Sequence, residues 1–283
     1  MSVQIFDDRP CELGEGPLWH PLRQQLFWFD ILGKRLLSQR DGEQLSWAFD
    51  EHVSAAGWVD KETLLIASET ALFTFDLTTG AQKPVCSLEA DNATTRSNDG
   101  RADPYGGFWI GTMGKGSESS AGAIYRLYKG ELRRIVSNIT ISNSICFAPD
   151  GSRAYFTDTV TKQIMSVALE NDSGWLVGAP EVFIDLSSAR LNPDGSVVDA
   201  DGNLWNAQWG ANRVACYASD GTFVKAVEFP AEQVSCPAFG GKDLNTLFAT
   251  TAAVGLTGAK EGLTFAITLA GVTGQLEHQV ILD

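Results

Sequence analysis

Side chains that can supply oxygen ligands recur along the chain at one position of a repeating pattern. That position lies about ten residues before each of a series of short apolar runs. It is occupied by Glu15, Ser54, Asn98, Asn143, Asp194 and Cys236, and four of these six residues carry a carboxylate or an amide. Carboxylate and amide oxygens are hard ligands that suit Ca²⁺, Mg²⁺ or Mn²⁺, and also Zn²⁺ or Fe(II) at low coordination number. If the fold brings these side chains together, a divalent cation would relieve the cost of burying them side by side.

The apolar runs that follow this position are typical of second strands in the blades of a β-propeller. They are about 40–50 residues apart, and Gly, Pro or Asp turns precede most of them. The runs are 26–30, 64–68, 108–112, 154–158, 204–208 and 247–251. Third and fourth strands follow several of them, and no amphipathic helix of ten or more residues is evident. The pattern predicts an all-β, six-bladed β-propeller of four-stranded antiparallel blades, rather than a β-sandwich pair or a β-helix.

The whole chain is expected to form one propeller domain, because no linker or change of composition divides residues 1–283. The first strand-like run, 3–6, is expected to complete the last blade together with 262–267 and 277–282, which would close the ring. In that arrangement the recurring position lies around one mouth of the central channel. Asp194 alone could be a simple turn residue. Its combination with Glu15 and Asn143 at the same phase favours a central metal site.

Four motifs, in this order and spacing, resemble the signatures of the regucalcin/gluconolactonase (senescence marker protein) family. They are Gly14-Glu15-Gly16-Pro17-Leu18-Trp19, Arg96-Ser97-Asn98-Asp99-Gly100, Ile141-Ser142-Asn143 and Pro193-Asp194-Gly195. The resemblance covers nearly the whole chain and implies a six-bladed propeller, in agreement with the repeats. It implies one metal ion held by Glu15, Asn143 and Asp194. One departure is Ser144, where the family usually has Gly, and we expect a local change in that loop with the ligand retained.

The resemblance also implies an activity, the hydrolysis of sugar lactones to aldonic acids. The cation, whether Ca, Zn, Mn, Mg or Fe(II), would act as a Lewis acid on the lactone. Asp194 is the preferred base for activating water, with hydroxide on the metal as the alternative. Arg96 and Asn98 are implied to contact the hydroxyls and carbonyl of the substrate, for which paired N–H donors and an amide are suited. Asp99 is interpreted as a turn residue.

Loops between second and third strands should open on the same face as the predicted metal site. The segment 113–122, rich in Gly and Ser, is expected to act as a lid, and it contributes Met113 and Glu118 as candidates for lining the pocket. Asp158 and Trp209 are further candidates from equivalent loops. Trp209 could stack on a sugar ring or pack between blades, whereas Trp19, Trp28, Trp109 and Trp205 are expected in the core.

Composition excludes several other classes of protein. A net charge of −14 argues against nucleic acid and anionic membranes as partners. The five cysteines are widely spaced, so neither a zinc nor a disulfide framework is expected. No basic leader and no run of roughly 20 apolar residues is evident, which makes the cytoplasm the default location. The three histidines form no zinc motif and lie away from the recurring position, and no phosphate loop is found.

Two other functions remain open from the sequence. One is a calcium-dependent esterase or phosphotriesterase, although Arg96 and Asn98 favour a polyhydroxylated substrate. The other is a calcium-binding propeller without catalysis. The preferred lactone, the physiological metal and the oligomeric state do not follow from the sequence.

Overall fold

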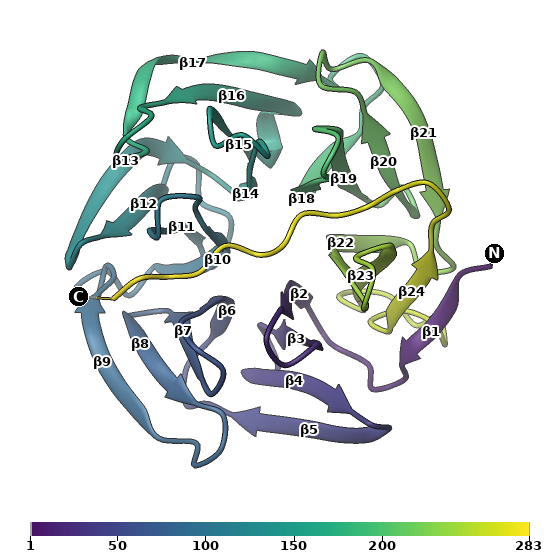
Figure 1. The fold of residues 1–283 in the computed structure, drawn as a ribbon, viewed down its shortest axis with the longest axis horizontal. Coiled ribbons are helices and arrows are strands. Elements are labelled where there is room, and N and C mark those ends of the chain that lie inside the picture. The colour runs from purple at the N-terminus through teal and green to yellow at the C-terminus, as the bar shows by residue number, and fades with distance from the viewer. Residues whose placement is uncertain (1, 283) are drawn as a thin grey trace.

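The computed structural model describes residues 2–282, and these form six four-stranded antiparallel sheets arranged radially about a central axis (Figure 1). From the innermost strand outwards, the first two sheets are β2 (Gly14–His20), β3 (Gln25–Asp30), β4 (Arg35–Arg40) and β5 (Glu43–Ala48), and then β6 (Val53–Trp58), β7 (Thr63–Ser68), β8 (Ala71–Asp76) and β9 (Gln82–Ser87). The next two are β10 (Thr95–Ala102), β11 (Phe108–Gly114), β12 (Gly122–Tyr128) and β13 (Glu131–Ile139), and then β14 (Ser142–Phe147), β15 (Arg153–Asp158), β16 (Gln163–Leu169) and β17 (Leu176–Asp185). The last two are β18 (Asn192–Val198), β19 (Leu204–Trp209), β20 (Arg213–Tyr217) and β21 (Phe223–Glu228), and then β22 (Gln233–Gly240), β23 (Thr246–Ala252), β24 (Thr264–Thr268) and β1 (Gln4–Asp7). The predicted all-β, six-bladed propeller is therefore confirmed.

Burial between neighbouring blades explains why the apolar runs recur with the blade period. The buried apolar side chains of the described residues form clusters that each span one interface between adjacent sheets. Trp28, Trp109 and Trp205, each in a second strand, are fully buried in or beside these interfaces. A four-stranded sheet cannot cover both of its own faces, so its stability depends on the two neighbours that pack against it.

Each innermost strand contains an irregularity close to the recurring position found in the sequence. The pairing register shifts between Glu15 and Leu18 in β2, and between Asn143 and Cys146 in β14. The other four innermost strands shift at equivalent places. A β-bulge bends the strand and redirects the side chains beside it. The repeated bulge therefore changes the direction of the side chains at this position in every blade.

The last part of the chain differs from the prediction. Residues 277–282 do not form a strand of the final blade, whose outer strand is β1 paired with β24. The C-terminal segment, residues 270–282, instead crosses the centre of the ring of blades from β24 towards β9 (Figure 1). Its backbone bonds reach different blades, since Val280 donates to the Trp58 carbonyl and Ile281 to the Gly106 carbonyl, both at 2.9 Å. The prediction was wrong because these bonds depend on the closed ring.

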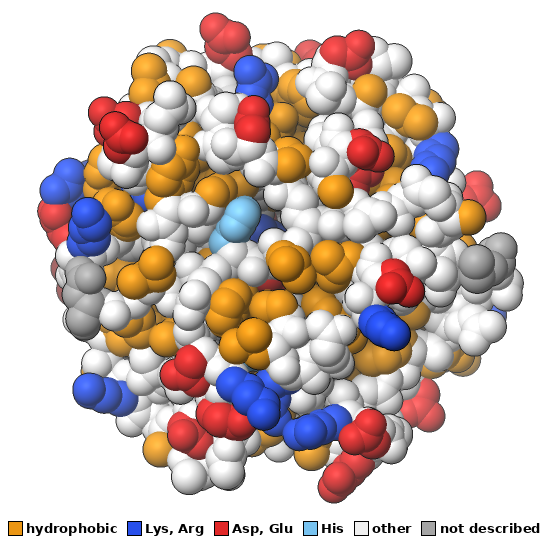
Figure 2. Space-filling model, viewed as in Figure 1, with side chains coloured by type: hydrophobic (Ala, Val, Ile, Leu, Met, Phe, Trp, Pro, Cys, Tyr) orange, Lys and Arg blue, Asp and Glu red, His pale blue; other side chains and the backbone are white. Residues whose placement is uncertain are grey.

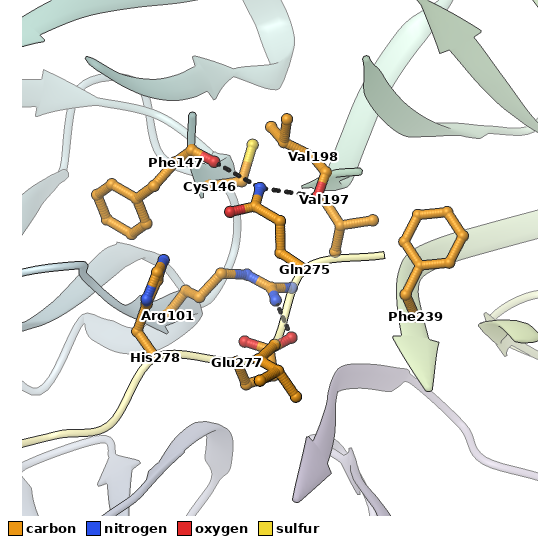
Figure 3. A pocket seen from close by; sticks show the side chains of 10 residues that line it. Arg101, Cys146, Phe147, Val197, Val198, Phe239, Gln275, Glu277 and His278 are labelled. Atoms are coloured by element: carbon orange, nitrogen blue, oxygen red, sulfur yellow. Dashed lines mark hydrogen bonds and ion pairs between the residues drawn. The ribbon is translucent and has the colours of Figure 1, made fainter. Parts of the chain in front are cut away.

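Side-chain hydrogen bonds and an ion pair hold the C-terminal segment against the innermost strands (Figure 3). The Gln275 amide donates to the carbonyls of Phe147, at 3.1 Å, and Val198, at 2.9 Å, which lie at the ends of β14 and β18. Arg101 forms an ion pair with Glu277 that is largely buried. On this face, charged side chains of both signs lie mostly towards the circumference (Figure 2).

A 3₁₀ turn, η1 (Thr159–Thr161), follows β15 and is the only helix in the described part of the chain. Within residues 2–282, then, no helix has the length and apolar character that crossing a membrane requires.

Candidate metal and substrate site

A cavity of about 250 Å³ lies at the end of the innermost strands away from the C-terminal segment. Its walls are formed by Leu13, Glu15, Arg96, Asn98, Met113, Ile141, Asn143, Thr159, Asp194 and Trp209. Arg96 and Asp194 lie near the beginnings of β10 and β18, whereas Arg101 and Val198, at the far ends of the same strands, line the opposite mouth. The volume is below the range of about 300–1,000 Å³ typical of drug-sized ligands, so it suits a molecule as small as a monosaccharide.

Two carboxyl groups are buried together in this cavity. Glu15 in β2 is 5% exposed and Asp194 in β18 is 5% exposed. Burial raises the pKa of both carboxyls above their usual range, and repulsion from Asp99 and from Glu15, respectively, adds to the effect. Two negative charges in such a site are unfavourable unless a cation compensates them.

Arg96 and Asn98 are held together on β10. Nη1 of Arg96 donates to Oδ1 of Asn98 at 2.7 Å and to the Ser97 carbonyl at 2.8 Å. Burial lowers the pKa of the guanidinium to about 10, while Glu15 is the largest of the negative charges that oppose this change. Arg96 therefore remains a cation at neutral pH. The Asn98 amide donates to the Ser142 carbonyl at 2.8 Å and to Oδ1 of Asn143 at 3.2 Å, which links β10 to β14.

The oxygen-bearing side chains of the cavity suit a hard divalent cation better than a metal that prefers sulfur ligands. No group of three or more His, Cys, Asp or Glu side chains suitable for a metal occurs in residues 2–282. Glu15, Asp194 and Asn143 nevertheless line one small cavity, and carboxylate and amide oxygens are preferred by hard cations. The raised pKa values of Glu15 and Asp194 mark a place where positive charge would be stabilising.

The other predicted pocket residues divide into two groups. Met113 and Trp209 line the cavity, each at the end of a second strand. Glu118 and Asp158 do not line it. The Glu118 carboxylate accepts a hydrogen bond from the Gly116 backbone at 3.0 Å, within the exposed loop. Asp158 accepts from the backbone N–H groups of Thr140 and Ile141, at 2.9 and 3.0 Å, and so holds the chain just before Asn143.

The structure differs from the interpretation of Asp99 as a turn residue. It lies within β10 rather than in a turn, is 4% exposed, and accepts a hydrogen bond from the Ile145 backbone at 2.7 Å. Burial raises its pKa to about 6. The register shift between Ser97 and Gly100 lies at this residue. The available signal in the sequence was an acidic residue directly after Asn98, which occupies the recurring position.

Ser144 occupies the left-handed region of backbone conformation, with φ of 59°. It is part of β14, and its hydroxyl donates to the Asp194 carbonyl at 2.5 Å. Ser196 and Asn206 donate to the same hydroxyl at 3.0 and 3.3 Å. Gly reaches this backbone region without strain, whereas the serine hydroxyl adds a bond between adjacent blades. Thr159 and Ile141 are further cavity residues that the sequence interpretation did not single out.

Comparisons with known proteins agree with this architecture. Residues 13–253 match the family described as "SMP-30/Gluconolactonase/LRE-like region". The chain is 38% identical to the L-arabinolactonase of Azospirillum brasilense, over 90% of this chain and 86% of that one. It is 33% identical to the pentonolactonase XacC of Haloferax volcanii, over 89% of this chain and 86% of that one.

A solved structure described as a calcium-binding protein, regucalcin, from Agrobacterium tumefaciens superimposes with a TM-score of 0.94. It is 39% identical, and the match covers 98% of this chain and 96% of that one. A match that spans most of the sequence and nearly all of the fold is more than a shared architecture. The chain belongs to the SMP-30/gluconolactonase/LRE-like family.

Proposed function

We propose that this protein hydrolyses a sugar lactone to the corresponding aldonic acid, with a divalent cation held by Glu15, Asn143 and Asp194. The observation that carries the proposal is the single small cavity that these three residues share with Arg96 and Asn98. It combines negative oxygens for a cation with donors for a polyhydroxylated ligand. Relatives named L-arabinolactonase and pentonolactonase support the same reaction class.

Arg96 would orient the lactone. Of the three guanidinium nitrogens of Arg96, only Nη1 donates hydrogen bonds to the described residues, namely to Asn98 and to the Ser97 carbonyl. The remaining N–H groups of the guanidinium can therefore donate to oxygens of the substrate, as a planar fork does to paired acceptors. Asn98 holds that guanidinium in place and adds an amide to the wall of the cavity.

Asp194 would act as the base. Its ionised carboxylate takes a proton from water as the water oxygen bonds to the lactone carbonyl carbon. The proton is then delivered to the ring oxygen as the bond between that oxygen and the carbonyl carbon breaks, which leaves a hydroxyl and a carboxylic acid. A bound cation, whether Ca, Zn, Mn, Mg or Fe(II), would polarise the carbonyl and keep Asp194 ionised despite its burial.

A pH-indicator assay of aldono-lactones, with and without a chelator, tests the proposal. Pentono-lactones come first because two relatives are named for them. Asp194→Asn should lower kcat/KM by about 100-fold or more, and chelation should do the same until metal is restored. Asp201→Asn is the matched control, because Asp201 is exposed in the turn between β18 and β19. Equal rates for all variants, with or without chelator, would refute the proposal.

A second candidate is cation binding without catalysis. It is favoured by the similarity to a structure described as a calcium-binding protein. This alternative predicts tight metal binding by the wild type but no metal-dependent change in lactone hydrolysis. The calcium-dependent esterase is distinguished by replacing Arg96 and Asn98, because simple ester activity that survives both replacements would count against a sugar substrate.

A further inference from the structure

A chain of hydrogen bonds crosses the wall of the cavity from blade to blade, and every bond in it has a defined direction. Arg96 donates to Oδ1 of Asn98 at 2.7 Å, and Nδ2 of Asn98 donates to Oδ1 of Asn143 at 3.2 Å. Nδ2 of Asn143 then donates to Oγ1 of Thr159 at 3.0 Å, and that hydroxyl donates to the Pro193 carbonyl at 2.8 Å. The series joins β10, β14, η1 and β18.

The two ends of the series determine the orientation of both amides. A guanidinium can only donate, and a proline carbonyl can only accept. Because Arg96 donates to it, Asn98 must present its oxygen to Arg96 and its NH₂ group to Asn143. Because Thr159 gives its only proton to Pro193, its oxygen is left to accept from Asn143. Rotating the Asn143 amide by half a turn would set two NH₂ groups against each other and leave Thr159 facing a carbonyl oxygen.

We propose that Thr159 is a positioning residue that holds the Asn143 amide with its oxygen available to a cation. This inference rests on the proposed function, in which Asn143 is a metal ligand. A carbonyl oxygen has two lone pairs, so Oδ1 can accept from Asn98 and still coordinate a metal. The opposite orientation would present an NH₂ group, which cannot bind a cation.

The backbone around Thr159 gives it a defined place. Thr159 is the first residue of η1, and its N–H donates to the Ile141 carbonyl at 3.0 Å, two residues before Asn143. Asp158, the preceding residue, accepts hydrogen bonds from Thr140 and Ile141. The turn that carries the Thr159 hydroxyl is thus fastened to the strand that carries the Asn143 amide.

The test is the affinity of the purified, metal-free protein for Mn²⁺, measured by isothermal titration calorimetry. Thr159→Val keeps the side-chain shape but removes the hydroxyl, and it should weaken Mn²⁺ binding by about 10- to 100-fold, as expected when a partner of a ligand is lost. Thr159→Ser retains the hydroxyl and should bind within a few-fold of the wild type. Thr161→Val is the matched control, since its hydroxyl bonds to the Asp158 carbonyl in the same turn and is exposed.

A double-mutant cycle separates positioning from general loss of structure. In an Asn143→Asp background either side-chain atom that faces the cation is an oxygen, so orientation no longer matters. Adding Thr159→Val should then cause little further loss of Mn²⁺ affinity. An equal loss in both backgrounds would show that Thr159 supports the fold and not the amide, and would overturn the inference.

A metal-free measurement completes the test. In NMR spectra of the protein in chelator, the Asn143 NH₂ protons should show a nuclear Overhauser effect to the Thr159 methyl group. Thr159→Val binding Mn²⁺ like the wild type would overturn the inference and leave the proposed function standing. A wild type that binds no divalent cation would remove the metal from the proposed function, and with it the positioning role of Thr159.

Discussion

Replacing Asp99 by asparagine should stabilise the metal-free protein at neutral pH. Asp99 is a buried carboxyl in β10, 4% exposed, where it accepts a hydrogen bond from the Ile145 backbone. An asparagine oxygen can accept the same bond, so the substitution removes the charge and leaves the contact. The buried charge is therefore the only intended change.

The magnitude follows from the pKa of Asp99, which burial raises from an ordinary value of 3.8 to about 6. At about 1.4 kcal/mol for each pH unit, this difference corresponds to about 3 kcal/mol. The folded state holds the proton more tightly than the unfolded state, so its stability falls as pH rises from about 4 to about 6. The advantage of Asp99→Asn should therefore be small at pH 4 and complete above pH 6.

Urea denaturation in the presence of chelator, repeated from pH 4 to pH 8, measures this difference. In thermal denaturation near pH 7, the midpoint temperature of Asp99→Asn should also be about 6 °C above that of the wild type, at about 2 °C for each kcal/mol in a chain of this size. Asp201→Asn, in an exposed turn, should change neither the urea midpoints nor the midpoint temperature. If Asp99→Asn gives a constant difference across the pH range, or destabilises the protein at pH 7, the reasoning about its burial is wrong.

Substitutions at two further positions, Ser144 and Glu277, test contacts elsewhere in the propeller. Ser144→Ala loses the hydroxyl bond to Asp194 and should cost about 1–3 kcal/mol; Ser144→Gly should cost less, because glycine relieves the left-handed backbone. Urea denaturation of both variants checks this order, and an alanine variant as stable as the glycine one would contradict it. Glu277→Gln leaves Arg101 buried without its anionic partner and should cost about 3 kcal/mol. The same change at Glu131, in an exposed ion pair, should have no measurable effect, and similar losses at both positions would contradict the burial argument.

Much of the candidate site could be predicted because a propeller converts sequence phase into spatial position. Glu15, Asn143 and Asp194 lie far apart in the chain, yet each stands beside the bulge near the start of its innermost strand, within one residue of the same point. All such points meet at one mouth of the channel, so the period alone predicted that these side chains share a cavity. The apolar second strands were predictable for the same reason, since every blade must cover the same two faces.

The sequence pattern was less informative about which partners individual side chains and the C-terminal segment would bind. Asp158 has the position expected of a pocket residue, but its carboxylate turns back to the backbone before Asn143. Residues 277–282 were predicted to be a strand of the last blade, but their backbone N–H groups donate to carbonyls of two other blades. The first outcome is set within one blade, where the end of β15 lies beside the start of β14. The second depends on which backbone groups the closed ring leaves unpaired.

By itself, then, the sequence determined the number of blades, the innermost strands and the acidic and amide residues at their recurring position, because these depend on short-range alternation repeated along the chain. Only the tertiary structure decided how the residues act on one another. The burial of Asp99 and the bond from Ser144 to Asp194 arise between blades, and the bond from Asn143 to Thr159 belongs to a series that joins three blades. Hydrogen-bond direction and charge burial are properties of neighbours in space, and the packed ring is what supplies those neighbours.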